Sequence, residues 1–287
     1  MDIVLIAGLW LDGPAVWADV AAHLEARGHR CLPVTLPGQG DGNTSATLAD
    51  QVAAVIAAVD AAAGRPMVVG HSAACSLAWL AADARPGQIS KVVLIGGFPA
   101  ADGGAYFDAA QDGALPFPGW SEFDGPDSAD LDDAAKQAIA SAAIPVPERV
   151  VRGVIRLTDE RRYDIPVVLV CPEFTPAQAR EWIGHGQVPE LAKSKDVSFA
   201  DIDSGHWPMI SAPADLARLL AQAAEESCPG GQRSLWQDAC APAADRFGSI
   251  GRVSWKRWPF PPAGPSSLHL VIPDRSSRRT TGGNDGR

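Results

Sequence analysis

A serine stands between small residues directly after a short apolar segment of this sequence. Met67-Val68-Val69 is typical of a buried strand, and Gly70-His71-Ser72-Ala73-Ala74 follows it. This matches the pattern G-x-S-x-G except in the last position, where alanine replaces glycine. A serine on such a sharp strand-to-helix turn exposes its hydroxyl at a helix N-terminus, where free N–H groups and the helix dipole favour a developing anion. We therefore predict that Ser72 is a nucleophile; the alternative is an ordinary N-cap serine.

A serine hydroxyl is a weak nucleophile at neutral pH, so a histidine must accept its proton. Four of the six histidines lie in or just after the first helix, in a surface loop or near the C-terminus: His23, His29, His185 and His269. His71 adjoins the serine, but its side chain points elsewhere in such a turn. His206 follows the last predicted strand in Ser204-Gly205-His206-Trp207-Pro208, so we predict that it is the general base.

The segments around these residues alternate between strand and helix patterns. Strands are predicted over 2–7, 30–36, 67–69, 91–95, 165–170 and 196–202, and helices over 14–27, 47–62, 73–84, 176–183 and 212–225. The internal Pro33 predicts an irregular or edge strand at 30–36. This alternation predicts an α/β fold with a mostly parallel sheet and helices on both faces. Ligands then bind at the C-terminal ends of the strands, where Ser72 and His206 meet.

Two stretches break the alternation. Residues 99–163 mix glycine, proline and aromatic residues with acidic ones, and only 131–143 has a clear helical pattern, so we interpret them as an inserted cap. Residues 228–287 hold eight glycines, seven prolines, and nine basic against four acidic residues. They are predicted to be a mostly disordered, basic tail. Residues 1–227 are predicted to form one domain.

The order of Ser72 on its turn, an inserted cap and a late His206 resembles the α/β-hydrolase superfamily over residues 2–226. The segments Ala7-Gly8-Leu9-Trp10 and Leu36-Pro37-Gly38-Gln39-Gly40 are similar to small esterases and hydroxynitrile-lyase-like members. Those members usually carry His-Gly where this chain has Ala7-Gly8. The resemblance implies an oxyanion hole formed by the backbone N–H groups of Leu9 and Ala73.

The acidic member of a triad is less clear from the sequence. The family's aspartate normally follows the strand at 167–170, but Thr175 occupies the aligned position, and Glu173 is the only carboxylate in reach. We predict that Glu173 orients His206. Asp102, in the loop after the preceding strand, is the alternative, and a site with no orienting acid or with another one is a third possibility.

The side chains near the strand ends are mostly apolar. Trp10, Phe98, Trp120 and Trp207 predict an apolar substrate pocket, although each is equally compatible with ordinary core packing. The histidines and cysteines lack metal-ligand spacing, and the glycine-rich stretches lack a Walker lysine or a G-x-G-x-x-G motif. No metal or cofactor is therefore expected.

Composition limits the class of protein. The 287 residues are 46% hydrophobic and 20% charged, with a net charge of −10, which is typical of a globular protein with a sizeable core. The acidic main body argues against nucleic-acid binding. No apolar stretch is long enough to span a membrane, no signal-peptide pattern opens the chain, and five scattered cysteines indicate reduced thiols, three of them in the core. A cytoplasmic location is expected.

These patterns favour a cofactor-independent serine hydrolase of the carboxylesterase type, which acts on a small-molecule apolar acyl or aryl ester. A lyase of the hydroxynitrile type would use the same residues without an acyl-enzyme. A non-catalytic small-molecule binding protein on the same fold is the third possibility.

Overall fold

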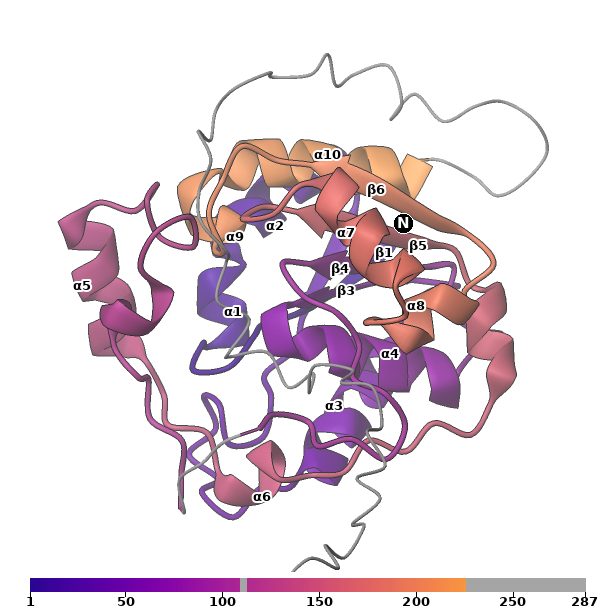
Figure 1. Cartoon of the computed structure of the whole chain (residues 1–287), viewed down its shortest axis with the longest axis horizontal. Coiled ribbons are helices and arrows are strands. Elements are labelled where there is room, and N and C mark those ends of the chain that lie inside the picture. Colours follow the sequence, from indigo (N-terminus) through magenta and orange to yellow (C-terminus); the bar gives the residue numbers. More distant parts are fainter. Residues whose placement is uncertain (109–112, 226–287) are drawn as a thin grey trace, which may run out of the picture.

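A computed structural model describes residues 1–108 and 113–225. Its centre is a sheet of six parallel strands in the order β2-β1-β3-β4-β5-β6 (Figure 1). The strands are β1 (Asp2–Ile6), β2 (Arg30–Pro33), β3 (Met67–His71), β4 (Lys91–Ile95), β5 (Val167–Cys171) and β6 (Val197–Asp201). The short β2 lies at one edge, as Pro33 predicts, because proline cannot donate to a second neighbour.

The sheet is buried on both faces because its strands are apolar at consecutive positions. One face of the sheet packs on the core under α2 and α10, to which Ile3, Leu5 and Met67 belong. The other face packs on the core under α3 and α4, to which Val4 and Val68 belong. Successive strand side chains point to opposite faces, so a continuous apolar run fills both cores. Figure 1 shows α2 and α10 on one side of the sheet and α3 and α4 on the other.

Outside the segment between β4 and β5, the described helices are α1 (Gly13–Val16), α2 (Ala18–Glu25), α3 (Leu48–Asp60), α4 (Cys75–Ala84), α7 (Pro176–Gly184), α8 (Pro189–Lys193), α9 (Pro208–Ser211) and α10 (Pro213–Glu225). Of these, α3, α4, α7 and α10 agree with the predicted ranges. The single helix predicted over 14–27 is divided at Trp17, the residue between α1 and α2, whose side chain is fully buried in the core under α2 and α10. The short α8 and α9 were not predicted, since four or five residues carry too little periodicity.

The segment between β4 and β5 contains the residues predicted to be an inserted cap, and it is called the cap below. It contains the 3₁₀ turns η2 (Trp120–Phe123) and η3 (Glu160–Asp164) and the helices α5 (Asp133–Ala142) and α6 (Glu148–Val151). Of these, α5 lies inside the range predicted as helical. The predicted tail at 228–287 lies outside the described residues.

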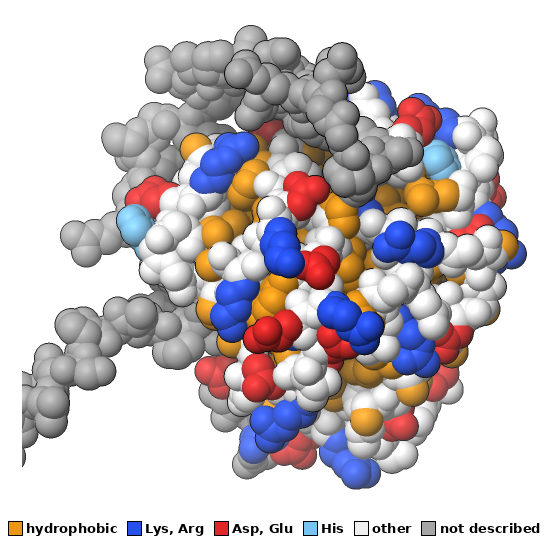
Figure 2. All heavy atoms as spheres, turned by 90° about the vertical axis from the view of Figure 1, so that its right-hand side faces the viewer, with side chains coloured by type: hydrophobic (Ala, Val, Ile, Leu, Met, Phe, Trp, Pro, Cys, Tyr) orange, Lys and Arg blue, Asp and Glu red, His pale blue; other side chains and the backbone are white. Residues whose placement is uncertain are grey.

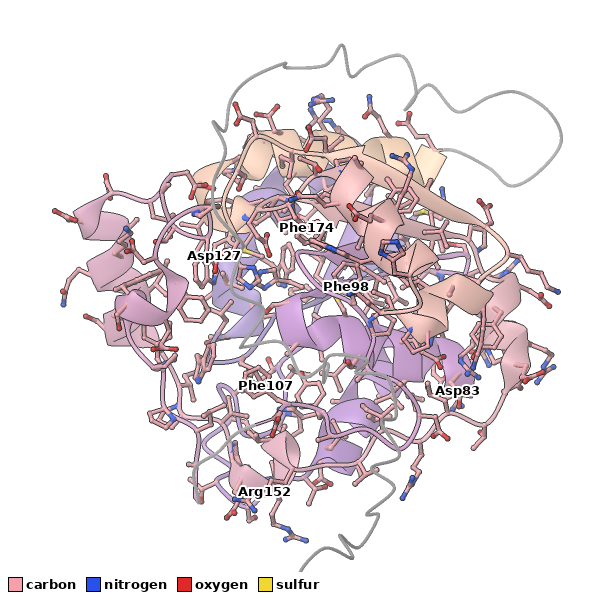
Figure 3. The ribbon with its side chains drawn as sticks, viewed as in Figure 1. Asp83, Phe98, Phe107, Asp127, Arg152 and Phe174 are labelled. Atoms are coloured by element: carbon pink, nitrogen blue, oxygen red, sulfur yellow. The ribbon has the colours of Figure 1, made fainter. Side chains whose placement is uncertain are left out.

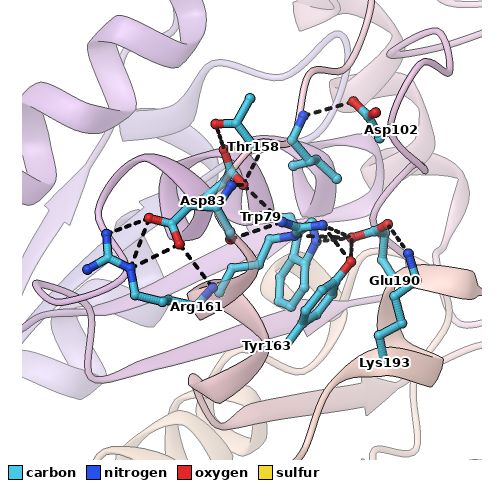
Figure 4. A network of polar contacts seen from close by, with 11 residues as sticks. Trp79, Asp83, Asp102, Thr158, Arg161, Tyr163, Glu190 and Lys193 are labelled. Carbon is cyan, nitrogen blue, oxygen red and sulfur yellow. Dashed lines mark hydrogen bonds and ion pairs between the residues drawn. The ribbon is translucent and has the colours of Figure 1, made fainter.

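A buried ion-pair network joins the last part of this segment to the main domain (Figure 4). The Arg162 guanidinium contacts Asp83 at 3.1 Å and Glu190 at 3.0 Å, and all three side chains are at most 7% exposed. Trp79 Nε1 donates to the same Glu190 carboxylate. Each buried charge at this junction of α4, η3 and α8 has an opposite partner, so removing one member of the network would leave an uncompensated buried charge.

Charged side chains of both signs are mixed on the surface seen in Figure 2. No helix in the described ranges is long and apolar enough to cross a membrane.

Candidate active site

Ser72 lies on a strained turn between β3 and α4. Its φ is +56°, a left-handed conformation that is rare for residues other than glycine. Two glycines make room for this turn. A methyl group at Gly70 would lie 2.5 Å from the carbonyl oxygen of Ala74, and one at Gly97 would lie 2.5 Å from that of Ser72. Strain of this kind costs about 1–3 kcal/mol and is concentrated at functional sites.

The loop after β6 brings His206 to this serine. His206 Nε2 lies 2.9 Å from Ser72 Oγ, although the two residues are 134 positions apart in the sequence. The His206 side chain is only 7% exposed, whereas Ser72 remains partly accessible. The parallel sheet explains this contact, because the C-terminal ends of β3 and β6 lie on the same side of the molecule.

Glu173 completes a continuous chain of hydrogen bonds. Its Oε1 lies 2.8 Å from His206 Nδ1, and its side chain is 10% exposed. Thr175, at the position where the family's aspartate aligns, instead accepts a hydrogen bond from the Gln178 amide and caps α7. Asp102 makes no contact with the histidine: its carboxylate instead accepts a hydrogen bond from the Leu157 amide at 2.9 Å, and Figure 4 shows this carboxylate and its bond.

The surroundings of His206 favour its protonated form. Burial alone lowers the pKa of the imidazole, but the Glu173 carboxylate, through its charge and its hydrogen bond, and then Asp127 outweigh burial and raise the pKa above 6.5. The imidazolium that forms when a histidine accepts a proton is therefore stabilised here.

His71, which adjoins Ser72 in the sequence, contacts the backbone of His206 and not the hydroxyl of the serine. Its Nε2 lies 2.8 Å from the carbonyl oxygen of His206, so it donates a hydrogen bond to the backbone that carries the predicted base. Complete burial lowers the pKa of His71 to about 3, with the nearby His206 acting in the same direction. His71 is therefore neutral at physiological pH and supports the His206 loop, which sequence reasoning did not predict.

The loop after β1 lies against the serine. A methyl group at Gly8 would lie 3.0 Å from Ser72 Cβ, closer than ordinary van der Waals contact, so glycine allows this approach without a shift of its neighbours. Leu9, whose N–H is one predicted oxyanion donor, follows Gly8. Ala73, whose N–H is the other, lies in the 3₁₀ turn Ser72–Ala74 that leads into α4. Trp10 has a φ of +67°, a second strained residue beside the site.

The cap makes backbone contacts with both loops. His206 N donates to the carbonyl oxygen of Asp127 at 2.8 Å, and Gly205 N donates to the Asp130 carboxylate at 2.7 Å. On the other loop, Trp10 accepts a hydrogen bond from the Ile144 amide, and its Nε1 donates to the carbonyl oxygen of Leu115. The cap thus helps to hold the two loops that flank Ser72.

Comparison with known proteins places this arrangement in a family. The sequence profile of the Alpha/beta hydrolase family matches residues 3–219. The chain belongs to the alpha/beta hydrolase family. No curated protein matches the sequence.

Solved structures share the family fold at low sequence identity. An extracellular alpha/beta-hydrolase from a Paenibacillus species is similar with a TM-score of 0.64 and 19% identity, covering 79% of this chain and all of the other. An Arabidopsis methylesterase has a TM-score of 0.62 and 15% identity, with 78% and 98% of the two chains covered. A pyrethroid hydrolase from Sphingobium faniae has a TM-score of 0.58 and 21% identity, with 78% and 97% covered.

In this family member the predicted pocket residues lie in two aromatic groups. Trp10, Trp120 and Trp207 belong to one group, which Phe117 and Phe123 connect through edge-on contacts. The Phe123 ring also stacks near His206, with ring centroids 6.3 Å apart. Phe123 was not predicted, because an aromatic residue in an irregular cap has no periodicity to indicate its direction.

Phe98 belongs to the second group. It stacks on Phe174 at 5.4 Å between centroids and contacts the edge of Trp182 (Figure 3). Phe174 directly follows Glu173, so this group adjoins the acid end of the hydrogen-bonded chain.

Proposed function

We propose that this chain is a serine hydrolase that cleaves carboxylic esters with small apolar acyl or aryl groups. The observation that supports it most is the unbroken chain from Ser72 Oγ through His206 to Glu173, with distances of 2.9 and 2.8 Å, on a strained turn. A nucleophile, a base and an orienting acid in this geometry are what acyl transfer requires.

In the proposed reaction Ser72 Oγ attacks the ester carbonyl carbon while His206 Nε2 takes the hydroxyl proton. The carbonyl electron pair moves to oxygen, and the N–H groups of Leu9 and Ala73 stabilise the oxyanion. Collapse of this intermediate breaks the bond to the alcohol, which leaves with the proton from His206. A water molecule then repeats the sequence on the acyl-enzyme and releases the acid. Throughout, the Glu173 carboxylate accepts a hydrogen bond from His206 Nδ1–H and stabilises the imidazolium.

The apolar substrate preference rests on the two aromatic groups beside the chain. Phe123 stacks near His206, and Phe174 adjoins Glu173, so apolar parts of a substrate have aromatic neighbours on both sides. A small-molecule substrate is accordingly proposed. The described cysteines, Cys31, Cys75 and Cys171, are free thiols, which supports a cytoplasmic location.

The test is covalent labelling of the full chain with a fluorophosphonate, followed by peptide mass spectrometry and an aryl ester assay. We expect label on Ser72, ester hydrolysis by the wild type, and loss of both in Ser72→Ala with an unchanged melting temperature. Ser90→Ala is the matched control. Ser90 precedes the N-terminal end of β4, whereas Ser72 follows the C-terminal end of β3, and the Ser90 hydroxyl bonds only to the Pro66 carbonyl.

Three outcomes contradict the proposal. Activity near the parent level in Ser72→Ala would remove Ser72 as nucleophile. A folded wild type that takes no label supports the binding-protein alternative. A labelled protein that cleaves cyanohydrins but no esters supports a lyase.

A further inference from the structure

We infer that Gln39 is a positioning residue for the oxyanion hole, which it serves by fixing the orientation of the peptide unit between Gly8 and Leu9. This inference rests on the proposed function. Gln39 lies in the loop after β2, is 1% exposed, and points its side-chain amide at the loop after β1. Its Nε2 donates to the carbonyl oxygen of Gly8 at 2.9 Å and to that of Leu11 at 3.4 Å.

Because the peptide unit is planar, the hydrogen bond from Gln39 to the Gly8 oxygen also fixes the direction of the Leu9 N–H. In a trans peptide the carbonyl oxygen of one residue and the N–H of the next point in opposite directions. A hydrogen bond that holds the Gly8 oxygen toward Gln39 therefore directs the Leu9 N–H away from Gln39. Ser72 lies against Gly8, since a methyl group there would be 3.0 Å from Ser72 Cβ. The geometry thus points the Leu9 N–H to the reacting side of the loop.

Gln39 is itself held in one orientation. Its Oε1 accepts a hydrogen bond from Gln51 Nε2 at 3.2 Å, and Gln51 Nε2 also donates to the carbonyl oxygen of Pro37 at 2.9 Å. Rotating the Gln39 amide by half a turn would place its oxygen against the oxygens of Gly8 and Leu11 and its nitrogen against the Gln51 nitrogen. Both contacts are repulsive, so the buried pair of glutamines specifies one orientation.

Without the Gln39 donor the Gly8–Leu9 peptide loses the contact that fixes its orientation. Turning it over would present the Gly8 carbonyl oxygen, in place of the Leu9 N–H, to the developing negative charge. Loss of one oxyanion donor costs about 10²–10³-fold in kcat. Binding of the uncharged substrate does not depend on this donor to the same degree, so the expected effect falls on kcat more than on KM.

The first experiment replaces Gln39 with methionine, which has a similar shape but no donor. For Gln39→Met we expect kcat on an aryl ester to fall by about 10²–10³-fold with KM changed by less than about threefold. The affinity for a trifluoromethyl ketone, which forms a serine-bound oxyanion, falls by a similar factor. The affinity for the corresponding methyl ketone, which binds without that charge, stays close to that of the wild type.

Gln51→Met is the matched control. Gln51 is fully buried and in the same network, but it donates to Pro37 and to Gln39, and not to Gly8. In Gln51→Met the Gln39 nitrogen stays toward Gly8, because a turned amide would still place its oxygen against the oxygens of Gly8 and Leu11. We expect the two variants to lose a similar amount of melting temperature, while Gln51→Met keeps kcat within about tenfold of the wild type. Equal losses of kcat and of trifluoromethyl ketone affinity in both variants would show a merely structural role and overturn the inference. So would unchanged values in Gln39→Met.

A second variant keeps the test valid if methionine prevents folding. In Gln39→Glu the introduced carboxyl donates to the Gly8 oxygen only while it is protonated, and once ionised it repels that oxygen. The ratio of variant to wild-type kcat is expected to fall as pH rises through the pKa of this carboxyl, and a flat ratio would overturn the inference. A wild type that takes no label at Ser72 refutes the proposed function and this inference together, whereas a labelled, active wild type leaves the Gln39 variants to decide the inference alone.

Discussion

Replacing Glu173 with glutamine tests the acid of the proposed triad. The change keeps the shape of the side chain but removes the charge that lies 2.8 Å from His206 Nδ1 in a position only 10% exposed. The amide can also donate to Nδ1, which would place the imidazole proton on Nε2, the atom that must accept the serine proton. Both effects act on the transition state, in which His206 becomes positively charged.

The size of the effect follows from the burial of this pair. Removing one partner of a buried ion pair costs about 3–5 kcal/mol, and each 1.36 kcal/mol changes a rate tenfold. The expected loss in kcat for Glu173→Gln is therefore about 10²–10⁴-fold. Because burial then lowers the pKa of His206 without opposition from Glu173, the acid limb of the remaining activity moves to lower pH.

The assay is steady-state hydrolysis of an aryl ester across the pH range in which imidazole titrates, together with circular dichroism to confirm folding. Asp102→Asn is the control, because Asp102 only accepts the Leu157 amide and the asparagine oxygen can do the same. A Glu173→Gln variant that is folded and within about threefold of wild-type kcat would refute the role assigned to this carboxylate. An acid limb that stays in place would refute the electrostatic argument.

Three further predictions concern the base, the turn and the cap junction. For the wild type, kcat/KM is expected to fall with decreasing pH through an apparent pKa above 6.5, because protonated His206 cannot accept the serine proton; a midpoint below 6.5 in the pH–rate profile contradicts this. Gly70→Ala places a methyl group 2.5 Å from a backbone oxygen and is expected to lower the free energy of unfolding by about 1–3 kcal/mol, whereas Gly87→Ala, with open space around it, leaves denaturant melts unchanged. Arg162→Met removes the guanidinium from the buried carboxylates of Asp83 and Glu190, and only the exposed Lys193 ammonium, 3.9 Å from Glu190, remains beside them; the fold should lose about 3–5 kcal/mol in urea unfolding, and a loss below about 1 kcal/mol would show that the network contributes little.

Periodicity and turn residues were sufficient to predict the architecture of the sheet. Outside the cap, strand and helix patterns alternate, and that order brings Ser72, Glu173 and His206 to the C-terminal ends of β3, β5 and β6, on one side of the sheet. The contact between Glu173 and His206 was predicted for the same reason, since few carboxylates follow β5. The break at Trp17 was missed, because a residue that stays in the helical region leaves the apolar period intact.

The supporting residues of the site were beyond sequence reasoning. Their contacts are hydrogen bonds to backbone carbonyl groups, donated by His71, Gln39 and Ile144. In the same way, the carbonyl oxygen of Asp127 accepts a hydrogen bond from the His206 amide. Any residue type presents a carbonyl, so such contacts leave no pattern in the partner's sequence. Only Gln39 and His71 had a signal, since each is a polar residue in a segment otherwise made of small or apolar ones.

The main-chain bonds between the cap and the loops at Trp10 and His206 have a consequence for divergence and engineering. A cap residue whose contact is a main-chain group, such as Ile144, can change in side chain without loss of the bond. At Asp127 the carbonyl bond would also survive such a change, but the charge that helps to raise the pKa of His206 would not. Insertions or deletions between residues 113 and 146 are expected to break these bonds, because they displace the Asp127 carbonyl group that accepts the His206 amide. A cap exchanged between relatives would therefore alter turnover as well as substrate choice unless its backbone path were preserved. Specificity is expected to evolve in this chain by point substitution at constant cap length.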